Sequence, residues 1–115
     1  MLLRNSLLMV CLLLPLPAAG GAPTFETEWG GTGTALGQID APYHLALDRH
    51  GNLFVTDSEN NRIQVFDSQG NLVKAWGVKG SGPGDFNIPG GVAIGAHGHV
   101  DIGDSDNNRF RSLTP

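Results

Sequence analysis

Two clusters of oxygen- and nitrogen-bearing side chains are the best candidates for chemistry in this chain. The pattern Asp-Ser-x-Asn-Asn-Arg begins at residue 57 and again at residue 104. Alternating carboxylate and amide oxygens suit a calcium loop, but such a loop also needs a glycine at its sixth position and a glutamate at its twelfth. Both copies have arginine at the sixth position and lack the glutamate. The pattern therefore predicts a structural hairpin turn, in which Asp and Asn bond local backbone groups and Arg pairs with Asp across the turn. The signature residues are Asp57, Asn60, Asn61, Arg62, Asp104, Asn107, Asn108 and Arg109.

Four histidines are the other possible metal ligands. His97 and His99 flank a glycine, and His44 and His50 lie further towards the N-terminus. Zinc needs three or four ligands in tetrahedral geometry. His50 and His97 each stand beside a glycine at matching places in two similar segments, which is typical of exposed turn residues. We therefore assign no metal ligand.

The glycine-rich segments 30–37 and 80–84 do not fit a nucleotide-binding loop. Neither precedes an apparent helix, and the chain contains no Gly-Lys-Ser or Gly-Lys-Thr. It also lacks the Gly-x-Ser-x-Gly pattern of a nucleophile elbow. We assign no catalytic or cofactor-binding residue, expect no cofactor, and predict that the protein is not an enzyme.

Both polar clusters belong to a longer repeat. Trp29-Gly30 recurs as Trp76-Gly77, an offset of 47 residues, and the same offset relates Pro42 to Pro89. A fixed period of this size indicates stacked units that bury their core only against their neighbours.

Short apolar alternations separated by Gly, Asn and Asp predict strands and turns in these units. The first unit has candidate strands at 43–48, 53–57, 62–66 and 71–76, and the second at 91–94, 99–102 and 108–113. Residues 24–29 match 71–76 by the Trp-Gly register, so they are predicted to form a lone fourth strand. Trp29 and Trp76 are expected to pack between units.

The second unit is more polar than the first. Asp101 stands where the first unit has Phe54, and Ser112 where it has Val65. An unpaired carboxylate on a dry sheet face would cost several kcal/mol. The second unit is therefore either a solvent-facing end cap or a decaying copy.

The segments 84–94 and 51–66 resemble the entry and the body of an NHL repeat, and the resemblance covers nearly all of residues 24–113. It implies an all-β fold of antiparallel four-stranded NHL-type β-propeller blades, most often about six in a ring. The chain has material for about two blades, an incomplete propeller. Residues 21–115 form the NHL-repeat region, with repeat one at 37–77 and a partial repeat two at 84–113.

The N-terminus predicts export. Arg4, the apolar run 7–14 and the small residues at 18–20 have the order of a secretory signal peptide, which we place at residues 1–20 as a signal helix. The apolar run is shorter than a membrane span. An uncleaved anchor, or a lipid on Cys11, is the alternative. Cleavage gives a secreted or periplasmic protein with no stable membrane span.

The charge restricts the partners. The chain has a net charge of −4 and no basic stripe, which excludes nucleic acid as a partner. We expect a non-enzymatic binding and interaction scaffold whose loops contact a protein or another extracytoplasmic ligand. The alternatives are a fragment of a secreted propeller enzyme, amidating-lyase-like or lactonase-like, and an inactive truncated repeat protein. Amidating lyases resemble this scaffold but take metal-binding histidines from several blades, which two blades cannot supply.

The strand inventory also suggests a route to assembly. The lone strand 24–29 of one copy could complete the open unit of another, and three copies would then close a six-bladed ring as a homo-oligomer. A fragment of a longer propeller is the competing interpretation.

Overall fold

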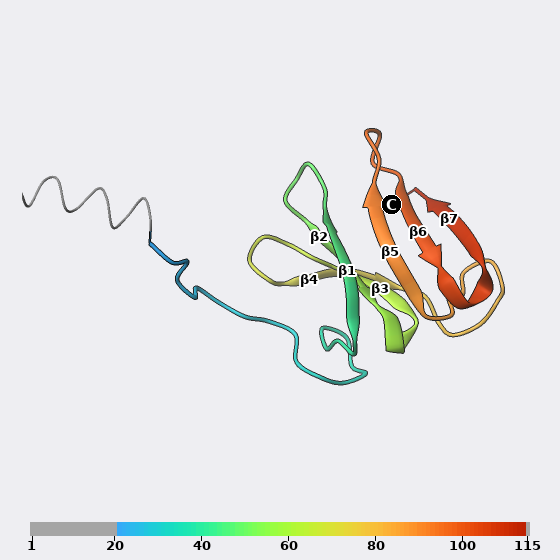
Figure 1. Cartoon of the computed structure of the whole chain (residues 1–115), viewed down its shortest axis with the longest axis horizontal. Helices are drawn as coiled ribbons and strands as arrows, with labels where there is room; N and C mark the ends of the chain where they lie inside the picture. The colour runs from blue at the N-terminus through green and yellow to red at the C-terminus, as the bar shows by residue number, and fades with distance from the viewer. Residues whose placement is uncertain (1–20, 115) are drawn as a thin grey trace, which may run out of the picture.

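A computed structural model describes residues 21–114 and contains two antiparallel sheets, which lie side by side in Figure 1. The first sheet has the strand order β1-β2-β3-β4 and the second has the order β5-β6-β7. The all-β prediction is confirmed, and the arrangement is propeller-like. The strands are β1 Pro42–Leu47, β2 Leu53–Asp57, β3 Arg62–Phe66, β4 Leu72–Trp76, β5 Pro89–Ile94, β6 Val100–Asp104 and β7 Arg109–Leu113.

Aspartates close the hairpins of the first sheet. Between β1 and β2, the Asp48 carboxylate accepts hydrogen bonds from the backbone N–H groups of His50 and Asn52, at 2.8 and 2.9 Å. Asp67 closes the β3–β4 turn in the same way. Burial alone would raise the pKa of Asp48, but the bonds from Asn52 and His50 outweigh it and lower that pKa. Each turn also contains a glycine at φ 82°, where a side chain would be strained.

The predicted strands match the observed ones to within two residues at either end. The largest differences are at β5, which begins at Pro89 rather than at residue 91, and at β6, which ends at Asp104 rather than at residue 102. The polar turns at 58–61 and 105–108 are more regular than predicted. Each contains a short 3-10 helix, Ser58–Asn60 in the first sheet and Ser105–Asn107 in the second.

The lone strand predicted at 24–29 is not present as a strand. These residues have no regular secondary structure and are exposed (the blue end of the ribbon in Figure 1). A strand needs a hydrogen-bonding neighbour, and no strand of residues 21–114 borders this segment. The predicted signal helix and Cys11 lie outside the described residues. Within residues 21–114, no helix is long and apolar enough to span a membrane.

The hydrophobic core lies between the sheets. The inner face of the first sheet presents Phe54, Ile63 and Val65, and Ala46 and Trp76 pack beside them. The inner face of the second sheet opposes it with Val92, Val100 and Ile102. Strands β1 and β5 run side by side where the sheets meet (Figure 1). Each sheet therefore buries one face and leaves an outer face without a covering sheet in the described chain.

Asp101 lies on the outer face of the second sheet and is exposed. The side chain of its equivalent, Phe54, is buried at 4% exposure in the core between the sheets. In the single chain the carboxylate keeps its water, as the end-cap interpretation of the second unit expects. On the same outer face, the side chain of Phe110 is 91% exposed.

Candidate functional site

The first polar cluster is a buried carboxylate surrounded by donors. Asp57 is fully buried, and Arg62 Nε donates to its Oδ2 at 2.6 Å. Amide groups of Asn60 and Gln64 donate to the same carboxylate at 2.9–3.1 Å, and so does the backbone N–H of Asp40, at 2.7 Å. These bonds replace the water that the buried charge has lost. The predicted pairing of Arg62 with Asp57 is confirmed.

The guanidinium of Arg62 does more than pair with Asp57. Its terminal nitrogens donate to the backbone carbonyls of Thr34, Ala35 and Gln38 at 2.8–2.9 Å. Asn60 also donates to a linker carbonyl, that of Gly33, at 2.8 Å. The cluster thus ties the segment that enters the first sheet onto that sheet, and we call it the first clamp. A fork of fixed N–H donors makes arginine suited to this task.

The second clamp repeats this geometry. Arg109 Nε donates to the buried carboxylate of Asp104 at 2.8 Å, and its terminal nitrogens donate to carbonyls of Ser81, Gly82 and Asp85. Asn107 donates to the carbonyl of Gly80 at 2.8 Å. Burial alone would raise the pKa of Asp104, but the hydrogen bonds and the positive charge of Arg109 outweigh it and lower that pKa.

Sequence reasoning placed these clamp residues in a turn but missed the linker carbonyls that they bind. Those carbonyls lie 24 to 28 residues from each arginine. Because every residue has a backbone carbonyl, the amino-acid type does not reveal which carbonyl an arginine binds. The only sequence signal was that the glycine-rich linkers repeat at the same offset as the clamps.

The first clamp also holds the second sheet. Asn61, at φ 54°, accepts a hydrogen bond from the backbone N–H of Ile88 at 2.9 Å, and the Ser58 hydroxyl donates to the carbonyl of Pro89. Asparagine tolerates this left-handed conformation better than most residues. The equivalent side chains in the second clamp, Ser105 and Asn108, are exposed, and neither makes a hydrogen bond within residues 21–114.

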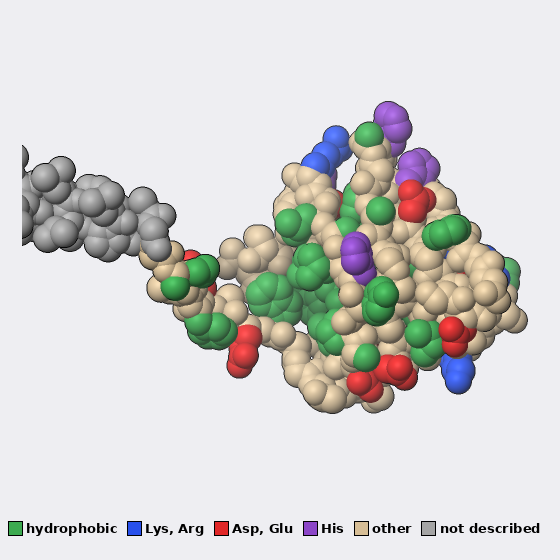
Figure 2. Space-filling view, viewed as in Figure 1, with side chains coloured by type: hydrophobic (Ala, Val, Ile, Leu, Met, Phe, Trp, Pro, Cys, Tyr) green, Lys and Arg blue, Asp and Glu red, His purple; other side chains and the backbone are tan. Residues whose placement is uncertain are grey.

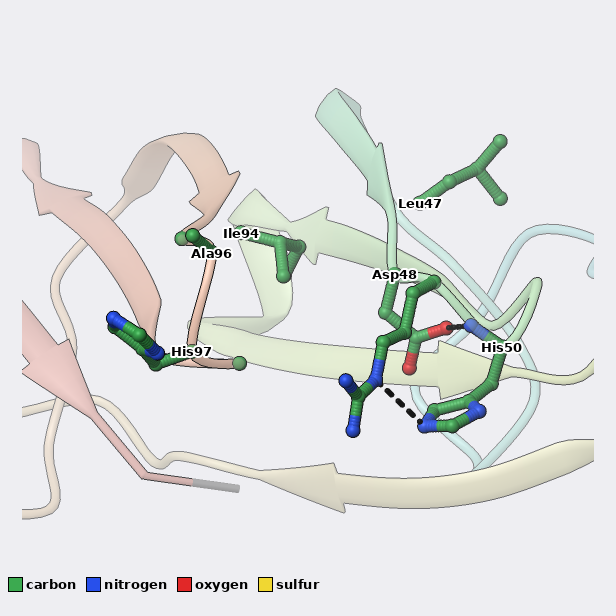
Figure 3. A pocket seen from close by; sticks show the side chains of 9 residues that line it. Leu47, Asp48, His50, Ile94, Ala96 and His97 are labelled. Atoms are coloured by element: carbon green, nitrogen blue, oxygen red, sulfur yellow. Dashed lines mark hydrogen bonds between the residues drawn. The ribbon is translucent and has the colours of Figure 1, made fainter.

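A cleft of about 370 Å³ separates the β1–β2 turn from the β5–β6 turn (Figure 3). Ile94 and Ala96 give it an apolar lining, Leu47 borders it with its side chain directed away (Figure 3), and Arg49, His50 and His97 are exposed beside it. Side chains of Arg and His gather at this end of the molecule in Figure 2. Arg49 Nε donates to His50 Nε2 at 3.3 Å, so one imidazole nitrogen is engaged within the turn itself.

The structure does not bring the histidines together as a ligand set. His50 and His97 occupy exposed turns, as predicted, while His44 Nδ1 contacts the backbone of Val92 at 3.1 Å and pins the two sheets together. Among residues 21–114, no group of three or more His, Cys, Asp or Glu is placed to hold a metal ion.

The two tryptophans differ in burial. Trp76 packs edge-on against Phe54 of its own sheet, with ring centroids 6.3 Å apart, and lies against the core that the two sheets share. Trp29 is 42% exposed and lies over Phe66, with ring centroids 6.4 Å apart.

Comparison with known proteins agrees with this architecture. Residues 44–66 match the NHL repeat family, so the chain carries an NHL repeat there. The chain is 36% identical over 56 residues to Protein lin-41 of Caenorhabditis elegans and 41% identical over 49 residues to Protein wech of Drosophila melanogaster. These matches cover 49% and 43% of this chain but only 4% and 5% of those proteins.

A solved structure shares the fold. An auxiliary nutrient binding protein from Bacteroides thetaiotaomicron superimposes with a TM-score of 0.53 and 20% sequence identity. The match covers 77% of this chain and 26% of that protein. At this level of identity the likeness concerns the fold alone.

Proposed function

We propose that this NHL-repeat chain is an exported, non-enzymatic binding scaffold made of propeller blades. In this proposal the cleft between the β1–β2 and β5–β6 turns binds a segment of an extracytoplasmic protein. The observation that carries the proposal is that the polar residues fall into two groups, one hydrogen-bonded within the chain and one exposed beside the cleft. The clamp arginines and aspartates are fully engaged with the chain's own linkers, whereas the polar groups beside the cleft face solvent.

The chemistry of the cleft favours one kind of segment. Its lining of Ile94 and Ala96 suits an apolar side chain, and burying one contributes about 1.5–3 kcal/mol. Arg49 and the neighbouring histidines suit a carboxylate next to that side chain. The Asp48 carboxylate, although it lines the cleft, is engaged by three hydrogen bonds from His50 and Asn52. We therefore expect a peptide that combines an apolar residue with Asp or Glu.

The experiment is a selection of displayed peptides on the immobilised protein, followed by fluorescence anisotropy with the enriched sequences. Acidic peptides with an apolar anchor should be enriched. The variant Ala96→Trp should abolish their binding, because the indole fills the cleft. The control Gln69→Trp adds the same side chain to the exposed β3–β4 turn and should bind normally. Equal binding by both variants would show that the cleft is not the site.

Export is tested separately. Gly20 ends the predicted signal peptide, so N-terminal sequencing of the extracytoplasmic protein should begin near Gly21. A stable product that still begins at Met1 and stays in the cytoplasm would contradict the exported role.

A further inference from the structure

Residues 24–29 lie where a fourth strand of a preceding sheet would lie. Gly77 leads from β4 into the linker held by the second clamp, and Gly30 leads from this segment into the linker held by the first clamp. Each linker also contains one parallel β-bridge at the equivalent place: Thr32 pairs with Ile39 in the first linker, and Lys79 pairs with Phe86 in the second. The ring of Trp29 rests on Phe66 just as Trp76 shares a groove with Leu113. No strand of residues 21–114 pairs with this segment.

The second sheet has three strands in the described chain and an open edge where its fourth strand would pair. The outer edge of β7 pairs with no strand in residues 21–114, although the equivalent edge of β3 pairs with β4. The groove next to that edge is lined by Lys74, Trp76, Leu113 and Thr114. Within it the Trp76 indole N–H is buried and has no hydrogen-bond partner in the described chain.

We propose that residues 24–29 of one copy add to β7 of a second copy as its fourth strand. The pairing of β3 with β4 sets the register, because the repeats are offset by 47 residues throughout. Ile63 opposite Trp76, Val65 opposite Lys74 and Phe66 opposite Leu72 become Phe110 opposite Trp29, Ser112 opposite Thr27 and Leu113 opposite Phe25. An extended peptide added to an open sheet edge gains a full ladder of backbone hydrogen bonds.

The side chains suit this register. Gln64 opposite Ala75 becomes Arg111 opposite Glu28, which places opposite charges on facing positions. Trp29 would cover Phe110, whose side chain is 91% exposed in the single chain. On the same face, the hydroxyls of Ser112 and Thr27 would stand in a row with Asp101, which already pairs with Ser112. These hydroxyls would donate hydrogen bonds to the Asp101 carboxylate. In the first sheet the equivalent positions of Asp101 and Ser112 are the apolar Phe54 and Val65.

The two side chains by which the first clamp bonds the next sheet, Ser58 and Asn61, have equivalents in the second clamp that make no such bond within residues 21–114. In the single chain, Asn61 and Ser58 of one sheet bond the backbone of Ile88 and Pro89 at the entry of the next. The equivalent pair, Ser105 and Asn108 of the copy that accepts the strand, would bond the equivalent backbone of Pro42 and Ala41 in the copy that donates it. Ala41 already has φ 50°, the same as Ile88, so its backbone is preformed for this contact.

The same contact would cover the apolar outer face of the first sheet. Leu45 and Leu47 are 59% and 64% exposed there. The equivalent positions of the second sheet, Val92 and Ile94, face the first sheet in the single chain. The second copy's sheet would meet this outer face in the same way. The contact is head-to-tail, so it forms a closed ring when the rotation permits.

Mixing two single-cysteine chains tests the register. In a Cys11→Ser background, one chain carries Thr27→Cys and the other Ser112→Cys, and both are oxidised together. Facing residues of an antiparallel pair lie within disulfide range. We expect a disulfide-linked heterodimer from this pair and its loss with the control pair Glu26→Cys and Ser112→Cys, whose side chains lie on opposite faces. Equal cross-linking by both pairs, or none by either, would overturn the proposal.

Light scattering on the full chain tests the docking pair. The wild-type chain should be larger than a monomer, and Ser105→Ala with Asn108→Ala should shift it towards monomer without loss of its circular dichroism spectrum. The exposed neighbour Asp106 provides the control, because Asp106→Ala should leave the assembly intact. A folded wild-type monomer at all concentrations would refute strand exchange.

Discussion

The outer face of the first sheet presents Leu45 and Leu47 to solvent, whereas the outer face of the second presents Asp101, Phe110 and Ser112. The two sheets come from copies of one unit, and their inner faces form a common core. Different positions of the repeat point outwards on each side, and the outer face of the second sheet is the more polar because Asp101 and Ser112 replace the apolar Phe54 and Val65 of the first unit. A repeat unit therefore has two distinct faces, one made to be covered by the unit before it and one by the unit after it.

The two clamps, unlike the two outer faces, have nearly the same Asp–Arg geometry. The carboxylates of Asp57 and Asp104 are both fully buried, and both arginines bind three linker carbonyls. The Asp–Arg pair of each clamp acts within a unit and its own linker, so its geometry does not depend on which neighbours are present, whereas Ser58 and Asn61 also bond the next unit. The sheet faces depend on those neighbours entirely.

Exchanging the residues that distinguish the two faces should produce the largest effect. Phe54→Asp removes a core aromatic ring, at about 3–5 kcal/mol, and buries a carboxylate without donors, at several kcal/mol more. We expect this variant not to fold. Asp101→Phe, at the equivalent exposed position, should change the stability of the monomer by less than about 0.5 kcal/mol. Urea denaturation followed by circular dichroism measures both, and similar losses in both variants would show that the faces are equivalent.

Removing each clamp arginine should rank next. Arg62→Ala leaves the buried Asp57 without its charged partner, which costs about 3–5 kcal/mol. The Arg109 side chain is more exposed than that of Arg62, 31% against 12%, so water can replace more of what is lost. We therefore expect Arg109→Ala to lower the free energy of unfolding by less. A larger loss at Arg109 would contradict the difference in burial between the clamps.

The glycines that enter the two linkers should respond unequally. A Cβ on Gly77 would lie 2.9 Å from the carbonyl oxygen of Asn61 and 2.7 Å from the ring of Phe86, whereas a Cβ on Gly30 would meet only Ile39, at 3.4 Å. Both glycines have φ near 106–109°. Gly30→Ala should cost about 1–2 kcal/mol for its backbone conformation, and Gly77→Ala about 1–3 kcal/mol more for the clash. Thermal denaturation of the two variants compares them directly, and equal losses would mean that the backbone at Gly77 moves freely.

Acidification should have the smallest effect near neutrality and a growing one below pH 4. Hydrogen bonds from Asn71 and Gln69 lower the pKa of Asp67 in the folded chain, and the pKa values of Asp48 and Asp104 are lowered as well. A lowered pKa means that the folded state binds protons more weakly than the unfolded state. The resulting stability is present above the ordinary pKa of 3.8 and is lost as the pH falls through the folded pKa values.

The melting temperature should therefore be flat between pH 5 and 7 and should fall below about pH 4. Asp67→Asn keeps the amide-accepting oxygen of the turn but cannot be protonated, so its melting temperature should fall less steeply. Melting curves across this range decide the matter. A melting temperature that rises on acidification would show that the sign is wrong.

Much of the architecture could be predicted from the sequence because it is local. The 47-residue offset, the alternation of apolar residues and the Asp-Asn-Gly turns depend on neighbouring residues, and they placed the observed strands to within two residues. The Asp–Arg pairing was predictable for the same reason, since its partners are five residues apart. The strand at 24–29 was predicted wrongly, because a strand forms only where another backbone offers an edge.

The sequence by itself determined the repeat, the strand order within each unit and the residues that form each clamp, since all of these follow from short-range pattern and turn chemistry. Only the tertiary structure decided which carbonyls the arginines bind and which face of each sheet is buried. It also brought the β1–β2 and β5–β6 turns together around one cleft. These properties depend on how two units pack, and packing joins groups that lie 24 or more residues apart in the chain.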